Sequence, residues 1–252
     1  MKNFIRSENC YLYFEKIECR SKIREIYSFF KYLLKRFLKS MCGRFELKTK
    51  FENLPTVLKQ DYPIGLDSKY ETQNLIRPND PVLVIKNEGR IKTTFMTWGF
   101  ISPWAKQPFD KERPRPFNAR SETLEEKKLF CGSWKHKRCL IPASGFFEKK
   151  YLVRKANYET FWLGGIWSKW TSPDGAELES CCVLTTEPND LIKPFHHRMP
   201  VIVPNGYEEQ WTEQVKDADE LKGLFPIMMS WSPDGWLLED VKKKETDQMS
   251  LF

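Results

Sequence analysis

The residues with the most distinctive chemical potential lie in the stretch Met-Cys-Gly-Arg-Phe at residues 41–45. If everything up to Met41 is absent, Cys42 carries a free α-amine and a thiol, groups whose typical pKa values are about 7.7–8.0 and about 8.5. The amine can condense with an aldehyde to an imine, and the thiol can then close a five-membered thiazolidine ring, a step that proximity favours. An internal cysteine has an amide nitrogen and cannot follow this route. The alternative is a small buried cysteine with a packing role.

The segment before this stretch, residues 1–40, differs in charge from the rest. It holds ten Lys or Arg and four Asp or Glu, and so supplies +6 of the formal net charge of +7. Residues 41–252 hold the other 31 basic and 30 acidic side chains, so net charge gives weak support for DNA binding by this part. Residues 21–39 have the spacing of a basic amphipathic helix, which could lie on a membrane or a partner. The sequence from Met41 onward is typical of the N-terminus of a protein. We therefore expect residues 1–40 to result from a mis-assigned translation start or to be a removable prefix.

Length and composition indicate a folded protein. A chain of 252 residues with 40% hydrophobic and 14% aromatic content can bury a full core. No apolar run is long enough to cross a bilayer, so we expect no membrane partner. Seven scattered cysteines and no secretory-type leader favour a cytoplasmic protein, associated with the nucleoid when on DNA. No nucleotide-binding fingerprint occurs and no cofactor is expected. Cys131, His136 and Cys139 lack a fourth ligand, so no metal is expected.

Residues 41–240 predict an α+β fold, a single domain with a mainly antiparallel, barrel-like β core and flanking short helices. Residues 81–85 and 90–98 have the pattern of a hairpin. A helix is predicted over residues 121–130, with Ser121 as its N-cap. Further strands are predicted at residues 138–153, 160–170, 180–186 and 198–203, and short helices at residues 205–213 and 217–225.

Five motifs occur in order along this region. They are MCGRF (41–45), WGFISPWAK (98–106), FNARSET (117–123), RCLIPASGFFE (138–148) and HHRMPVIV (196–203). Together they resemble the SOS-response-associated peptidase (SRAP) family, also called abasic-site processing proteins. The resemblance implies a protein that binds single-stranded DNA and crosslinks covalently to abasic sites through its terminal cysteine. A ring-opened abasic sugar is an aldehyde, the partner that the chemistry of Cys42 requires.

The resemblance implies four catalytic residues. Cys42 corresponds to the nucleophile, Asn118 to the residue that positions it and helps to hold the sugar, and Glu148 to the general acid/base carboxylate beside the imine. His196, in the family pattern His-x-Arg-Met-Pro, corresponds to the histidine that assists sugar ring opening by proton transfer. Both steps need a proton donor and acceptor near neutral pH. His197 is the alternative in the doubled histidine, and we expect it to be structural.

Three arginines and two tryptophans are candidates for DNA contact. By resemblance, Arg120 and Arg198 correspond to residues that contact phosphates, and Arg44 follows the nucleophile closely enough to join them. Guanidinium groups bind phosphate oxygens bidentately, although a surface salt bridge is the alternative for any single arginine. Trp98 and Trp104 could stack on bases or wedge beside the missing base, with core packing as the competing interpretation.

Two positions depart from the family pattern. Lys149 follows Glu148 where an aromatic residue is common, so packing or DNA contact behind Glu148 is expected to differ. Leu75 stands where many members have Asn. Neither residue belongs to the proposed chemistry itself.

The end of the chain carries a separate motif. Residues 241–252 predict a flexible tail, polar and then abruptly hydrophobic. The tail ends in a pentapeptide that resembles the motif by which proteins bind the bacterial sliding clamp, namely Gln248, Met249, Ser250, Leu251 and Phe252. Its glutamine offers hydrogen bonds and its Leu-Phe pair suits an apolar pocket. The alternative is a hydrophobic chain end that docks on its own domain.

Three functions remain open on these grounds. The first is an abasic-site sensor that forms a thiazolidine crosslink through Cys42 and protects the site during replication or the SOS response. By resemblance, it extends to abasic lyase activity and to crosslink reversal through Glu148. The second is a cysteine peptidase with Cys42 as nucleophile and His196 as base, which removes its own prefix. The third is a non-catalytic module that binds single-stranded DNA or the clamp. We expect a monomer.

Overall fold

The computed structural model describes residues 43–63, 65, 70–109, 115–229 and 231–241, and the statements below concern these residues. Cys42, the segment 1–40 and the tail motif at residues 248–252 lie outside the described residues, so the predictions made for them stay predictions. Within the described ranges, no helix combines the length and the apolar character that crossing a membrane requires.

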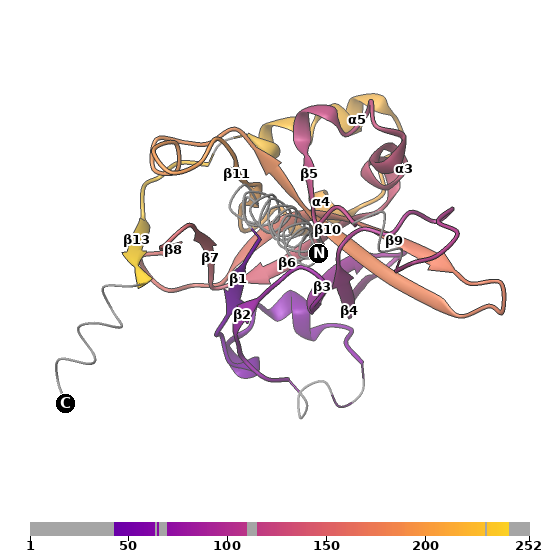
Figure 1. Ribbon diagram of the computed structural model, residues 1–252, viewed down its shortest axis with the longest axis horizontal. Helices are drawn as coiled ribbons and strands as arrows, with labels where there is room; N and C mark the ends of the chain where they lie inside the picture. The colour runs from indigo at the N-terminus through magenta and orange to yellow at the C-terminus, as the bar shows by residue number, and fades with distance from the viewer. Residues whose placement is uncertain (1–42, 64, 66–69, 110–114, 230, 242–252) are drawn as a thin grey trace, which may run out of the picture. The chain divides into compact units, whose positions relative to one another are not determined.

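A closed barrel of five strands forms the centre of the domain (Figure 1). β9 pairs with β10 as well as with β6, which closes the ring. Every pairing in the barrel is antiparallel except the parallel pair of β10 and β4. The α+β fold with a mainly antiparallel, barrel-like core is therefore confirmed. In hydrogen-bonded order the strands are β10 (Glu177–Thr186), β4 (Ile91–Trp98), β3 (Pro81–Asn87), β6 (Arg138–Ala143) and β9 (Phe161–Thr171).

Parts of the barrel are buried on both faces, which explains the continuous apolar sequences of β6 and of the second half of β10. All six residues of β6 are buried, as are the last seven residues of β10. Side chains of adjacent residues in a strand point to opposite faces, yet Cys181 and Cys182 are both 0% exposed. β10 is therefore covered on both sides.

Glycine in the middle of β9 permits this close packing. A Cβ on Gly165 would lie 2.9 Å from the carbonyl oxygen of Cys182 and 3.0 Å from Sγ of Cys139. Since the carbonyl belongs to a barrel strand and cannot move cheaply, we expect Gly165→Ala to lower the free energy of unfolding by about 1–3 kcal/mol, measured by urea denaturation.

Gly132 supplies the matched control, because a Cβ there would meet nothing within 4 Å. It lies inside α3 (Lys128–His136), where alanine is favoured over glycine by about 0.5–1 kcal/mol. Gly132→Ala should therefore stabilise the protein. Equal unfolding midpoints for the two variants would contradict the packing argument.

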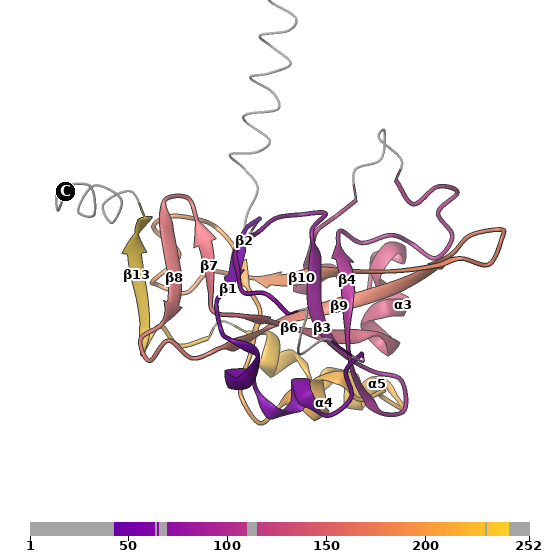
Figure 2. The same cartoon turned by 90° about the horizontal axis from the view of Figure 1, so that it is seen from below.

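A second sheet of five antiparallel strands lies beside the barrel (Figure 2). β7 follows β6 after Ser144, and β8 follows β7 after the turn Lys149–Lys150. The stretch 138–153, predicted as strand, is therefore broken into three strands shared between two sheets. In order, the strands are β13 (Trp236–Asp240), β8 (Tyr151–Lys155), β7 (Gly145–Glu148), β1 (Phe45–Leu47) and β2 (Gln73–Ile76).

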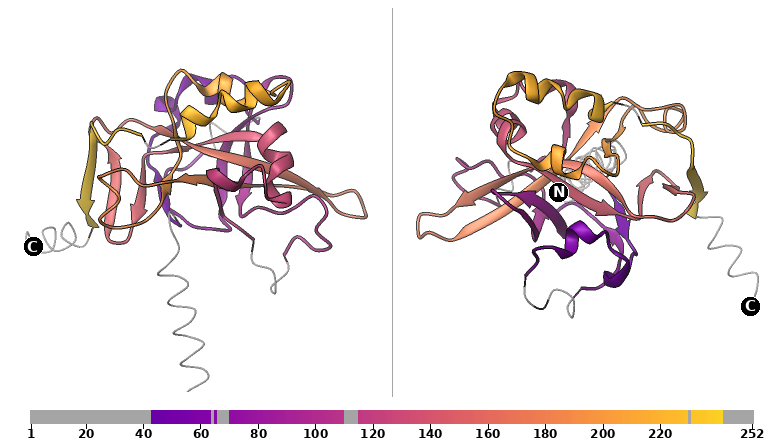
Figure 3. Two further views of the ribbon diagram at one scale, coloured as in Figure 1. Left: turned by 90° about the horizontal axis from the view of Figure 1, so that it is seen from above. Right: turned by 180° about the vertical axis from the view of Figure 1, so that it is seen from behind.

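Short helices flank the barrel, as predicted, and Figure 3 shows the orange and yellow helical segments of residues 205–229 gathered on one face. The helix predicted over residues 121–130 is wrong, because Ser121–Thr123 is a 3-10 turn and α3 begins only at Lys128. Ser121 is buried within this turn, and the N-cap positions of the turn and of α3 are taken by Arg120 and Lys127. The remaining elements are η1 (Phe51–Asn53), η2 (Thr56–Lys59), η3 (Ser121–Thr123), η4 (Phe225–Met228), α4 (Glu208–Thr212), α5 (Ala218–Lys222), β5 (Asn118–Arg120), β11 (Met199–Pro200) and β12 (Ile202–Val203).

Candidate active site

β1 carries the chain away from Cys42 along the edge of β7. Phe45 pairs with Phe146, and the backbone N–H of Phe147 donates to the carbonyl of Arg44 at 2.9 Å. Continued by two positions, this register places Gly43 opposite Glu148, the last residue of β7. Glu148 is buried, with 3% of its surface exposed. The residue that follows Cys42 in the chain therefore lies beside a buried carboxyl group.

Trp98 joins β1 to the segment that carries Asn118. Its ring packs edge-on against Phe45 and Phe117, with centroid distances of 5.1 and 5.9 Å, and its indole N–H donates to the carbonyl of Phe117 at 2.8 Å. Asn118 follows at the start of β5, opposite Val183 of β10. Because Trp98 is 0% exposed, it presents no face to a base. The geometry supports core packing for Trp98, the competing interpretation, and gives it a positioning role.

His196 lies in the loop before β11, close to the turn between β7 and β8. Its Nδ1 accepts a hydrogen bond from the backbone N–H of Arg198 at 3.1 Å, so the neutral ring carries its proton on Nε2. Burial, followed by the neighbouring His197 and Lys149, lowers the pKa of His196 below 6.5. At pH 7 the imidazole is therefore neutral, with Nε2–H as a hydrogen-bond donor. The exposed ring of His197 stacks on it at 4.3 Å between centroids, and the structural role of His197 stays a prediction.

An aromatic contact holds the His196 loop against β8. The rings of Phe195 and Tyr151 lie 4.5 Å apart between centroids. Tyr151 pairs with Glu148 across the β7–β8 turn. The loop that carries His196 is therefore packed against the hairpin that carries Glu148.

Arg198 is buried in an ion pair. Its guanidinium donates to both carboxylate oxygens of Glu122, at 2.5 and 2.6 Å, and to the carbonyl of Thr185. Burial raises the pKa of Glu122, but the hydrogen bond and charge of Arg198 outweigh it, and the net pKa is lowered. The arginine thus ties the segment after β5 to β10 and to the His196 loop. The salt-bridge alternative fits this geometry, and the phosphate contact stays a prediction.

Three of the predicted DNA contacts are accessible. Arg44 and Arg120 are exposed, and Trp104 is 65% exposed. The loop of Trp104 is held by a hydrogen bond of 2.7 Å from the indole N–H of Trp170 to the carbonyl of Ala105. These side chains present the surfaces that phosphates and bases require, and their contacts with DNA remain predictions.

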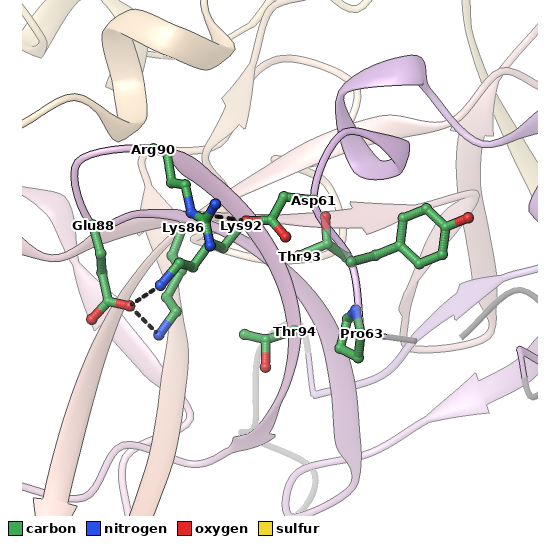
Figure 4. A pocket seen from close by; sticks show the side chains of 9 residues that line it. Asp61, Pro63, Lys86, Glu88, Arg90, Lys92, Thr93 and Thr94 are labelled. Atoms are coloured by element: carbon green, nitrogen blue, oxygen red, sulfur yellow. Dashed lines mark ion pairs between the residues drawn. The ribbon is translucent and has the colours of Figure 1, made fainter. Parts of the chain in front are cut away.

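Two hollows among the described residues are lined by other side chains. One of about 260 Å³, between η2 and the β3–β4 hairpin, is rich in charge, but Figure 4 shows its charges paired, Lys86 and Lys92 with Glu88 and Arg90 with Asp61. A larger hollow of about 620 Å³ runs from Lys48 to Asn205. Neither is lined by Asn118, Glu148 or His196.

The buried cysteines of the described residues offer little reactivity. Cys139 is 0% exposed, and burial raises the pKa of its thiol well above 9. Cys131 is only partly buried, yet among the described residues no group of three or more His, Cys, Asp or Glu side chains is placed to hold a metal.

Sequence reasoning missed two contributions to the site. For Trp98, core packing was weighed against base stacking, but the link that its ring makes between β1 and Phe117 was not foreseen. Lys149 was noted only as a departure from the family pattern, although it lies within electrostatic reach of His196. That departure was the available signal, but the proximity of Lys149 to His196 depends on the fold.

Similarity to known proteins covers most of the chain. The family model of the SOS response associated peptidase (SRAP) matches residues 41–238. The abasic site processing protein YoqW of Bacillus subtilis (strain 168) is 34% identical over 195 residues, which cover 73% of this chain and 86% of that protein. The abasic site processing protein YedK of Escherichia coli (strain K12) is 25% identical over 223 residues, which cover 81% and 96%.

A solved structure shares the fold. The crystal structure of a protein from Bacteroides thetaiotaomicron superposes with a TM-score of 0.66 at 21% identity, covering 78% of this chain and 90% of that chain. The family model spans most of the chain, from the MCGRF motif to β13. The chain therefore belongs to the SOS response associated peptidase (SRAP) family.

Proposed function

We propose that this protein processes abasic sites in single-stranded DNA and bonds to them covalently through Cys42 once residues 1–41 are absent. The observation that carries the proposal is the register of β1 and β7, which, when continued by two positions beyond Phe45, leads the residue after Cys42 toward buried Glu148. The relatives named as abasic site processing proteins support the same role.

The reaction joins the Cys42 amine to the aldehyde carbon of the ring-opened sugar. The carbinolamine loses water to give an imine, and the thiol then adds to the imine carbon, so that the thiol proton moves to nitrogen and the thiazolidine forms. In this scheme Glu148 takes the amine proton and returns it to the departing hydroxyl. Asn118 holds the sugar, and Nε2–H of His196 donates to the sugar ring oxygen as the ring opens. Reversal through Glu148, and strand cleavage from the imine, use the same groups.

Other side chains around the site are proposed to contact the phosphates and bases that flank the abasic sugar. Arg44, Arg120 and Arg198 are proposed to bind phosphates, and Trp104 to stack on a base. For Arg198 this requires its contact with Glu122 to be exchanged or shared.

The C-terminal tail is proposed to bring the protein to the replication fork. Its motif at residues 248–252 would bind the bacterial sliding clamp, with the glutamine hydrogen-bonded and the Leu-Phe pair in an apolar pocket. Binding there would place a monomeric abasic-site protector where single-stranded DNA is exposed during replication.

The experiment that tests the function is an intact mass. The protein expressed from its full reading frame is incubated with a single-stranded oligonucleotide that contains one abasic site. A species that begins at Cys42 and is heavier by one strand, less one water, supports the proposal. A protein that begins at Cys42 and stays unshifted contradicts it and favours the peptidase. An unshifted protein that keeps residues 1–40 shows that the prefix blocks the reaction.

The pH dependence of crosslinking is expected to report on His196. The amine of Cys42 must lose its proton, so the logarithm of the rate should rise by about one per pH unit below the typical amine pKa of about 7.7–8.0. Protonation of Nδ1 of His196 would break its bond from the Arg198 N–H. The pKa of His196 lies below 6.5. At pH values below this pKa, both the amine and His196 must lose a proton, so the slope of the logarithm of the rate against pH should rise from one toward two.

His196→Gln is the control for this profile. The variant should react about 10²–10⁴-fold more slowly and keep a slope of one throughout, because only the amine then titrates. The measurement is the crosslinking rate of the wild type and of His196→Gln on denaturing gels, between about pH 5 and pH 8. A wild-type slope that stays at one down to the lowest pH would mean that protonated His196 is competent.

A further inference from the structure

The turn between β7 and β8 places a lysine directly after Glu148. Glu148 and Tyr151 are paired across the turn, and Lys149 has a φ of +55°. This left-handed conformation is unfavourable for a residue with a side chain and is taken up readily by glycine. Residues held in such sparsely populated backbone conformations cluster at active sites and ligand-binding sites.

The two lysines of the turn differ in their charge partners. Nζ of Lys150 lies 2.5 Å from a carboxylate oxygen of Asp240. Lys149 is exposed, and no carboxylate of the described residues forms an ion pair with it. Lys149 thus presents a positive charge that the protein leaves uncompensated within the described ranges.

A second cationic side chain contacts the backbone of Lys149. The guanidinium of Arg44 donates to the carbonyl of Lys149 at 2.8 Å and lies over the ring of Phe147 at 5.4 Å. Arg44 also lies two residues after Cys42 in the chain. Like Lys149, Arg44 forms no ion pair with a carboxylate of the described residues, so an anion bound beside this turn would offset two positive charges.

We propose that Lys149, together with Arg44, binds a backbone phosphate of the DNA strand next to the abasic nucleotide. The inference rests on the proposed function and extends it to a residue at which this chain departs from its family's pattern. An ammonium group serves as a compact point charge for phosphate, and the arginine adds directed hydrogen bonds. Such contacts set the position of the strand and are independent of base sequence. Lys149 thus fixes the strand so that the sugar faces the end of β7.

The salt dependence of binding tests this contact. The protein that begins at Cys42 is titrated with a fluorescent, intact single-stranded oligonucleotide over a range of salt concentrations. Each phosphate contact on single-stranded DNA contributes about 0.7 to the slope of log K against log salt. Lys149→Gln should lower the slope by about 0.7 and weaken binding several-fold at low salt. Lys149→Arg should keep the slope.

Two further variants separate charge from turn geometry. Lys150→Gln removes the same charge one residue away, where Asp240 already compensates it, and should leave the slope unchanged. Lys149→Gly removes the charge while favouring the left-handed turn, and should lower the slope as Lys149→Gln does. Equal slopes for the wild type and Lys149→Gln, or equal losses for Lys149→Gln and Lys150→Gln, would overturn the inference.

Crosslinking of the wild type to an abasic oligonucleotide is measured in parallel. If the wild type crosslinks while its slope equals that of Lys149→Gln, only the role of Lys149 fails. If the wild type does not crosslink, the proposed function fails, and a slope difference on intact DNA would then support a phosphate contact in a DNA-binding protein of another kind.

Discussion

Replacing Cys42 by serine, in a protein that begins at residue 42, is expected to abolish stable crosslinking to abasic DNA. Serine keeps the α-amine, so the imine still forms, but its hydroxyl is a far weaker nucleophile than a thiol and does not hold the adduct as a stable ring. The imine then returns to free protein and aldehyde in water. On a denaturing gel the variant should show no shifted band unless borohydride is added to reduce the imine. The wild type should shift without borohydride.

A second comparison isolates the amine. A protein that retains residues 1–41 has an amide at the Cys42 nitrogen, so neither imine nor thiazolidine can form at that residue. It should fail to crosslink even with borohydride, unless the prefix is removed.

The control for Cys42→Ser is its non-covalent affinity for intact single-stranded DNA, which should equal that of the wild type. A stable borohydride-independent band from the serine variant would contradict thiazolidine formation.

Much of the fold could be predicted from local sequence patterns, because the spacing of apolar residues in a strand indicates which of its side chains are buried. The predicted hairpin at residues 81–85 and 90–98 corresponds to β3 and β4, whose register runs from the pair Pro81–Thr97 to the pair Asn87–Ile91. By contrast, the predicted helix at residues 121–130 failed because tertiary contacts override local preference. Glu122, expected in a helical first turn, instead binds the guanidinium of Arg198, 76 residues away.

The site was less predictable, because burial and pairing join segments far apart in the chain. The motif WGF contained Trp98, but nothing in its sequence shows that the ring fills the space between Phe45 and Phe117. The same limit applies to Arg198, whose motif does not reveal an ion pair with Glu122. The pairing of β1 with β7, on which the proposed chemistry depends, likewise links residues about a hundred positions apart.

Arg138 is expected to make the largest single contribution to stability among the buried charged residues described. It is 1% exposed and donates hydrogen bonds only to backbone carbonyls. Its guanidinium reaches Trp134 and Lys135 at the end of α3, and Trp211 and Glu213 at the end of α4. The last carbonyls of a helix have no partner within it, so one side chain caps two helices. Burial lowers the pKa of Arg138 to about 10, which leaves it charged at neutral pH.

Arg138→Met keeps most of the buried volume and removes every donor. Each buried carbonyl left without a partner costs about 1–3 kcal/mol, and partial access of water to the helix ends reduces the sum. We expect the free energy of unfolding to fall by about 3–5 kcal/mol, measured by urea denaturation. Arg90→Met is the control, because Arg90 is 73% exposed in an ion pair of 3.2 Å with Asp61 and should cost less than about 1 kcal/mol. Similar losses for the two variants would show that the helix ends find other donors when Arg138 is absent.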